Sequence, residues 1–241
     1  MPTVHPISRR DMLAIPALAL TPPLLARNEK MRNPAAFVLY TFGDSILDCG
    51  RYNDRGIHPG QLLVRNDDGL FPEFRGKDLQ SRGPARLVHC AVDGATVASL
   101  ASQARDVHPV KNAVALLTVG GNDLLQGLAA DKGPGVRAFS EALDRFLAGL
   151  ALRPVLIGNV YDPTFGEDSR NFLGVAPGIA RANHRRVNEV IARLAARYGE
   201  LVDLHGHFLQ GQPSWFTRTI EPSLTGASEV RRAFLPALGL A

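Results

Sequence analysis

The sequence predicts an α/β protein: a three-layer αβα sandwich with a five-stranded parallel sheet, formed by residues 34–241. Two observations predict this fold. Short apolar runs recur along the chain, and amphipathic helical patterns separate them. Strands that alternate with helices form a parallel sheet whose two faces are both covered by helices. With 241 residues, the chain is long enough for one domain with a sizeable core.

The predicted strands are runs of apolar residues without a polar face, which is typical of strands buried on both sides. The first is the segment AFVLYTF at 36–42, which is rich in residues that favour β-structure. The other four predicted strands lie at 86–91, 113–119, 154–160 and 200–205.

Two helices are predicted from apolar residues spaced three and four apart, over 136–150 and over 187–198. Gly199 is a helix stop after the second one. The segment 50–84 differs because it is rich in Gly, Asp, Arg and Pro and has no clear period. It is predicted as a long loop, part of which packs against the domain through Phe71 and Phe74. Loops of this length in compact domains are usually functional or disordered.

The composition is that of an ordinary globular protein, with 45% hydrophobic and 21% charged residues. Of the net charge of +4, residues 1–35 carry +3, from five basic and two acidic residues. A nucleic-acid-binding protein clusters positive charge on its folded surface, so the sequence argues against that class of partner. The two cysteines, Cys49 and Cys90, lack the spacing of a metal site and are expected to be free thiols.

Residues 1–33 are predicted to be an export signal. An arginine pair precedes the uncharged stretch 12–26, which is too short to span a bilayer, so no stable membrane insertion is expected. The segment SRRDML at 8–13 resembles a twin-arginine signal, which predicts a periplasmic or secreted protein. The alternative is that 1–30 is an upstream extension and that translation starts at Met31, which would leave the protein in the cytoplasm. We favour export.

A candidate site lies where the first three predicted strands end. Gly43-Asp44-Ser45 follows the first strand, Asp93-Gly94 is in the turn after the second, and Gly120-Gly121-Asn122-Asp123 follows the third. Ligands of open parallel sheets bind beyond the carboxyl ends of the strands. Each short motif is a weak signal by itself, but their joint placement predicts a site that contains Ser45, Gly94 and Asn122.

These three blocks, FGDSILDCG, AVDGATV and TVGGNDLL, resemble those of the SGNH (GDSL-type) hydrolase family, and the resemblance covers nearly all of 36–238. It implies a flavodoxin-like fold and a serine esterase or acyl hydrolase that acts on a small-molecule ester without a cofactor. It further implies that Ser45 is the nucleophile. The backbone N–H groups of Ser45 and Gly94 and the side-chain amide of Asn122 would form the oxyanion hole, which stabilises developing negative charge.

The last block of the chain departs from the pattern of that family, which reads Asp-x-x-His-Pro. In the segment RTIEPSLTG, Glu221 stands at the histidine position and Arg218 at the aspartate position. We expect Glu221 to replace the histidine as general base, because burial beside Ser45 would raise its pKa. The positive charge of Arg218 would lower that pKa.

Other histidines remain open as the base, namely His58, in the segment GIHPG, and His205 and His207. Strand alternation would place Asp203, His205 and His207 on one face, a spacing that also suits a metal. We favour a structural role for them and expect no metal. His184 is expected on the helix surface.

Two alternatives to an acyl-enzyme esterase stay open: a non-catalytic binding protein that retains the pocket, and a metal-assisted hydrolase. The sequence does not identify the acyl chain, the leaving group or the oligomeric state.

Overall fold

The computed structural model describes residues 36–108 and 110–241. These residues belong to one compact unit, Pro34–Ala241. The predicted export signal, its boundary at residue 33 and the alternative start at Met31 lie outside the described residues.

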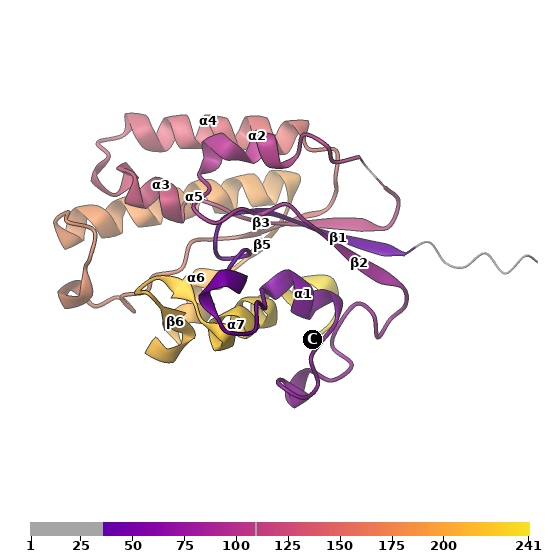
Figure 1. Ribbon diagram of the computed structural model, residues 1–241. Coiled ribbons are helices and arrows are strands. Elements are labelled where there is room, and N and C mark those ends of the chain that lie inside the picture. Colours follow the sequence, from indigo (N-terminus) through magenta and orange to yellow (C-terminus); the bar gives the residue numbers. More distant parts are fainter. Residues whose placement is uncertain (1–35, 109) are drawn as a thin grey trace, which may run out of the picture. The chain divides into compact units, whose positions relative to one another are not determined.

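The central sheet has five parallel strands in the order β2-β1-β3-β4-β5 (Figure 1). This confirms the predicted fold class. The apolar runs of β1, β3 and β4 are buried on both faces; in β1, every residue after the first is buried. The prediction of strands buried on both sides is wrong for β2 and β5, because these two strands form the edges of the sheet and are only partly buried. The strand bounds are β1 Phe37–Gly43, β2 Ala85–His89, β3 Ala113–Thr118, β4 Val155–Gly158 and β5 Gly199–Val202.

Helices cover both faces of the sheet, and alternate residues of β1 contribute to the two layers of core. Tyr40 and Phe42 belong to the cluster under α4 and α5, and Leu39 belongs to the cluster under α1 and α7. The first face carries α2 Leu100–Gln103, α3 Gly121–Leu125, α4 Pro134–Gly149 and α5 Pro177–Tyr198 (Figure 1). The opposite face carries α1 Pro59–Val64, α6 Leu204–Leu209 and α7 Leu224–Phe234.

Both predicted helices are confirmed as α4 and α5, but α5 begins earlier than predicted. Its N-terminal turns carry polar side chains such as Arg181 and His184, so they lack the apolar period that identifies the rest of the helix. Pro177, whose fixed φ angle suits the first turn of a helix, starts it.

The predicted strand at 200–205 is wrong at its end, because β5 stops at Val202 and α6 starts at Leu204. The cause is a helix cap: the carboxylate of Asp203 accepts a hydrogen bond from the backbone N–H of Gly206 at 2.9 Å. Residues 204–209 are therefore helical, and the alternation that would place Asp203, His205 and His207 on one face does not exist.

The long segment 50–84 is more ordered than its sequence predicts, because it contains α1 and two 3₁₀ turns, η1 Gly50–Tyr52 and η2 Pro72–Phe74. Phe74 is buried, as expected, and the guanidinium of Arg231 lies 3.5 Å from the centre of its ring. Cys49 and Cys90 are free thiols, also as expected. Over 36–108 and 110–241, no helix has the length and hydropathy needed to cross a membrane.

The remaining short elements lie in the connections. They are η3 Val97–Ser99, η4 Leu128–Ala130, η5 Asp168–Arg170, η6 Pro213–Trp215, the antiparallel pair β6 Phe216–Thr217 and β7 Glu221–Pro222, and η7 Pro236–Leu238.

Candidate active site

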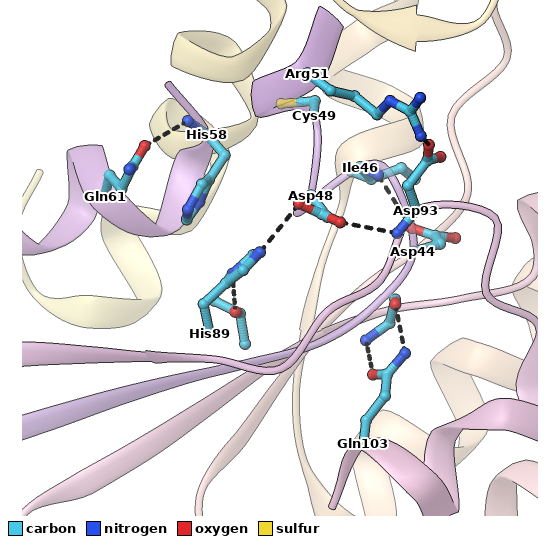
Figure 2. A network of polar contacts seen from close by, with 12 residues as sticks. Asp44, Ile46, Asp48, Cys49, Arg51, His58, Gln61, His89, Asp93 and Gln103 are labelled. Carbon is cyan, nitrogen blue, oxygen red and sulfur yellow. Dashed lines mark hydrogen bonds and ion pairs between the residues drawn. The ribbon is translucent and has the colours of Figure 1, made fainter. Parts of the chain in front are cut away.

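Ser45 is the second residue after β1 and is held in a tight turn. Gly43, the last residue of β1, has a φ of +113°, and a Cβ there would collide with the carbonyl group of Thr118 on β3. Gln103 donates to the carbonyl oxygen of Gly43 at 2.8 Å and accepts from its N–H at 2.7 Å (Figure 2). Ser45 is only 8% exposed. The nucleophile candidate therefore sits on a turn that neighbouring segments fix in place.

The buried side chain of Asp44 stabilises this turn. Its Oδ1 accepts hydrogen bonds from the hydroxyl of Thr118 at 2.8 Å and from the backbone N–H of Ile46 at 3.2 Å. Burial raises the pKa of Asp44 to about 7, although the two hydrogen bonds act to lower it. Asp44 is therefore a turn-forming residue that titrates near neutral pH.

The backbone N–H groups of Ser45 and Gly94 are free to bind a ligand. No acceptor among the described residues receives a hydrogen bond from either of them. The segment that carries Gly94 is tied to the turn of Ser45 by a 2.9 Å hydrogen bond from the N–H of Val92 to the carbonyl of Gly43. Gly94 has a φ of +80°, which a side chain would disfavour.

Asn122 lies on α3 and lines the same cavity as Ser45. Its side-chain amide donates a hydrogen bond to the carbonyl of Ala95 at 3.0 Å, which orients the amide group. An NH₂ group carries two hydrogens, so this bond leaves one donor of Asn122 for a ligand.

Glu221 lies beside Ser45, on the short strand β7, where it pairs with Thr217 of β6. Its Oε2 atom is buried and has no hydrogen-bond partner among the residues of the described chain. The Ser45 hydroxyl lies close enough to the Glu221 carboxylate to lower its pKa. The two side chains do not form a hydrogen bond of normal geometry in the described structure. Glu221 is therefore a carboxylate near the Ser45 hydroxyl with spare hydrogen-bonding capacity, which makes it a candidate proton acceptor.

The surroundings of Glu221 raise the pKa of its carboxyl group. Burial raises the pKa of the carboxyl above its ordinary value, and the charge of Asp93 adds to this effect. The Ser45 hydroxyl, Arg218 and Arg51 act in the opposite direction without reversing it. Burial and Arg218 thus act in the two opposite directions expected from the sequence, and burial has the larger effect.

Both arginines contact groups other than Glu221. Arg51 pairs with the carboxylate of Asp93 at 3.0 Å, and the guanidinium of Arg218 lies 5.1 Å from the ring centre of Tyr52. The hydroxyl of Tyr52 donates to Asp93 at 2.7 Å.

The histidines considered as alternative bases have other contacts. His58 precedes α1, and its ring stacks on that of His89 at 4.0 Å between centres. Burial lowers the pKa of His58 to about 4. His207 pairs with Glu229 of α7 at 2.9 Å, and the ring of His205 packs against that of His184. In the described part of the chain, no histidine is hydrogen-bonded to Ser45.

His184 lies half-buried and lines the cavity, so the expectation that it is a surface residue is wrong. Its Nε2 is 2.9 Å from the carbonyl oxygen of Val160, which holds the ring inward. The sequence of a helix segment rich in charged residues does not reveal which of its side chains face the protein interior.

The metal hypothesis loses its structural premise, since Asp203 caps α6 while His205 and His207 contact different partners. In the ranges 36–108 and 110–241, no group of three or more His, Cys, Asp or Glu side chains is arranged to hold a metal ion.

A cavity of about 110 Å³ opens beside Ser45 and Asn122, and its walls are mainly apolar. Segments 160–164 and 171–181 supply much of this lining, and no sequence pattern predicted that they would. The apolar wall consists of Ile46, Leu124, Leu125, Val160, Tyr161, Pro163, Phe172, Leu173, Pro177, Ala180 and Ile220. The polar part of the wall contains Asp162, Thr164, Glu167, Asn171, Arg181 and His184.

The fold and this serine-containing cavity are those of a hydrolase that acts on ester bonds. The model of the GDSL-like lipase/acylhydrolase family matches residues 41–227, which include the end of β1, the Ser45 turn, Asn122 and Glu221. The chain belongs to this family. The resemblance that the three sequence blocks indicate is thereby confirmed.

Solved structures of similar fold include an α/β hydrolase enzyme from the metagenome of Lake Arreo, Spain. It is 27% identical, with a TM-score of 0.60 over 85% of this chain and 97% of that one. A lipase/acylhydrolase from Enterococcus faecalis is 13% identical, with a TM-score of 0.59 over 84% and 95% of the two chains. An acetyl xylan esterase from Geobacillus stearothermophilus is 18% identical, with a TM-score of 0.59 over 85% and 95%. No curated protein matches the sequence.

Proposed function

We propose that the protein is a serine esterase that cleaves carboxylic esters through an acyl-enzyme on Ser45, with Glu221 as the general base. The observation that carries this proposal is the placement of Glu221 beside the Ser45 hydroxyl, with Oε2 buried and lacking a partner in the described structure. A serine hydroxyl needs a neighbouring group to take its proton, and Glu221 is the group beside it.

This geometry supports the following acylation step. Glu221 takes the proton of Ser45 while Oγ bonds to the ester carbonyl carbon, and the electron pair of the C=O bond moves to the oxygen. The tetrahedral intermediate then collapses, the bond to the leaving alcohol breaks, and protonated Glu221 returns the proton to that alcohol. Deacylation repeats the sequence with water as the nucleophile and Ser45 as the leaving group.

The oxyanion of each intermediate would be bound by the N–H groups of Ser45 and Gly94 and by the free amide hydrogen of Asn122. In support, both N–H groups lack an acceptor in the described structure, and the Asn122 amide is already oriented by Ala95. Preorganised donors of this kind are usually the largest single contribution to catalysis of acyl transfer.

The cavity supports esters with an apolar acyl chain as substrates. Its walls beside Ser45 are formed mainly by aliphatic and aromatic side chains, which would contact a hydrocarbon chain better than a sugar. Burying two additional methylene groups contributes about 1.6 kcal/mol, so butyrate esters should exceed acetate esters in kcat/KM by roughly tenfold.

The test is turnover of activated esters by wild type and Ser45→Ala, together with labelling by an organophosphonate. We expect wild type to hydrolyse the ester and to carry the phosphonate on Ser45, and Ser45→Ala to do neither. Ester turnover by Ser45→Ala would remove Ser45 from its role. Tight binding of esters by wild type without turnover or labelling would support the non-catalytic binding protein instead.

A further inference from the structure

Asp48 joins the two segments that carry the backbone donors of the proposed oxyanion hole. Its Oδ2 accepts a hydrogen bond from the backbone N–H of Asp93 at 2.9 Å, and Asp93 directly precedes Gly94. Asp48 itself is tied to the Ser45 turn, since its N–H donates to the carbonyl of Asp44 at 3.0 Å. Figure 2 shows the Asp48 carboxylate between His89 and Asp93. One side chain thus spans from the turn of Ser45 to the peptide that leads into Gly94.

The other oxygen of Asp48 is held as well. Oδ1 lies 3.2 Å from Nε2 of His89, whose Nδ1 is 2.7 Å from the hydroxyl of Thr41 (Figure 2). These contacts are compatible when Thr41 donates to Nδ1 and the Nε2–H group of His89 donates to Asp48. Stacking of His58 on His89 restricts the ring further. The orientation of the Asp48 carboxylate is therefore fixed by a chain of contacts.

The residues after Asp48 strengthen the same connection. Arg51 and Tyr52 both donate to the carboxylate of Asp93, at 3.0 and 2.7 Å. The segment 48–52 therefore holds Asp93 at its main chain and at its side chain. Gly94 needs this support because it is exposed and a glycine has unusual backbone freedom.

We propose that Asp48 is a positioning residue for ester hydrolysis, which sets the Gly94 N–H at the correct spacing from the Ser45 N–H. This inference rests on the proposed function. Oxyanion donors act only at hydrogen-bonding distance from the developing charge, and loss of one costs about 10²- to 10³-fold in kcat. A shift of about 1 Å is expected to have an effect of roughly 10²-fold.

The first test compares ester turnover by wild type, Asp48→Ala and Asp48→Asn. Asp48→Ala should lower kcat about 10- to 100-fold and leave KM within about twofold, because the interaction matters in the transition state. Asp48→Asn should recover most of the activity, since its Oδ1 can still accept the Asp93 N–H. Asp48→Glu keeps the charge but moves the carboxylate, so its kcat should also fall.

Asp131→Ala is the matched control. Asp131 likewise accepts backbone hydrogen bonds, from Gly133, Gly135 and Val136, but these residues lie outside the segments that carry Ser45 and Gly94. Its loss should lower the thermal unfolding temperature and leave kcat unchanged. If Asp131→Ala and Asp48→Ala reduce kcat equally, Asp48 acts only through stability and the proposal fails.

A double-mutant cycle with Gly94→Ala tests whether Asp48 acts through Gly94. No heavy atom outside the neighbouring residues lies within 4 Å of a Cβ at Gly94, so this change mainly disturbs the backbone through its positive φ. If both changes misplace the same donor, the combined loss in kcat should be clearly smaller than the product of the two single losses. Independent, multiplicative losses would overturn the proposal.

The outcomes separate this inference from the proposed function. If wild type hydrolyses the ester and Ser45→Ala does not, but Asp48→Ala has normal kcat, only the role of Asp48 is rejected. If wild type neither hydrolyses the ester nor reacts with the phosphonate, both fail. If Asp48→Ala does not fold, the comparison of Asp48→Asn with Asp48→Glu tests the proposal. If both of these variants have the kcat of wild type, Asp48 is not a positioning residue.

Discussion

The carboxylate of Glu221 lies beside the hydroxyl of Ser45, with one oxygen buried and unpartnered in the described chain. An exposed glutamate, with a pKa of about 4.3, would be a weak base toward a serine hydroxyl. Burial raises the pKa of Glu221, which improves its match to proton transfer near neutral pH. Burial thus makes this glutamate better suited to act as a general base, a role for which serine hydrolases usually use a histidine.

Glu221→Gln should lower kcat about 10²- to 10⁴-fold, because the amide cannot accept the serine proton. In wild type, kcat/KM should fall as the pH drops through the raised pKa of Glu221, since protonation removes the base. The acid-side decline should therefore begin above the pH at which an ordinary glutamate titrates. The measurement is the pH dependence of kcat/KM for one ester in wild type and Glu221→Gln.

Asp44 also titrates near neutral pH, so Asp44→Asn is the control for this profile. The asparagine retains an acceptor oxygen for Thr118 and Ile46, and the acid-side decline should persist in this variant. If the decline disappears in Asp44→Asn but persists in the residual activity of Glu221→Gln, then Asp44 and not Glu221 controls the pH dependence.

The double variant Glu221→His with Arg218→Asp should be a faster esterase than wild type. A histidine with a pKa near 6.5 is a better matched base, and a neighbouring aspartate would orient its ring and favour its charged form. We expect kcat to rise by about tenfold, as measured with the same ester. A double variant slower than wild type, with an unchanged unfolding temperature, would show that this backbone does not place a histidine correctly.

Phe172→Ala should weaken the preference for apolar acyl chains. Phe172 is 40% exposed and lines the cavity, so its removal takes apolar contact from the acyl chain. The ratio of kcat/KM for octanoate to that for acetate should fall about three- to tenfold. Leu209→Ala is the control, because Leu209 is also 40% exposed but does not line the cavity. Equal ratios in both variants would argue that the cavity does not bind the acyl chain.

Gly43→Ala should destabilise the fold by about 3 kcal/mol or more, because the new methyl group would collide with the main chain of Thr118. Gly56→Ala is the comparison: its φ is also positive, at +64°, but the space around it is open. That change should cost only about 1 to 2 kcal/mol, from the left-handed backbone alone. Denaturant unfolding of both variants measures the difference, and similar losses would contradict the close approach of β1 and β3.

We also propose that residues 1–33 direct export. The arginine pair and the apolar stretch behind it motivate this proposal. Fractionation of the native host should find the protein outside the cytoplasm with a shortened N-terminus, and Arg9→Lys with Arg10→Lys should retain it inside. Cytoplasmic protein that begins at Met31 would reject export.

The sequence by itself determined the sheet and the three strand-end blocks. A buried strand needs only a local run of apolar residues, so 36–42 and 113–119 predict β1 and β3 closely. The positions of Ser45, Gly94 and Asn122 follow, because the carboxyl ends of neighbouring parallel strands meet at one edge. Glu221 could be assigned a place only through the resemblance of its segment to the last block of the SGNH family.

Tertiary structure decided what depends on contacts between distant residues. The end of β5 was mispredicted because the cap at Asp203 competes with strand extension, and a short apolar run does not show which one wins. His184 turns into the cavity because the Val160 carbonyl holds its ring, 24 residues away along the chain. The bond from Asp93 to Asp48 joins residues 45 apart. Local periodicity encodes secondary structure, whereas such pairings form only once the elements pack, which is why they were not predicted.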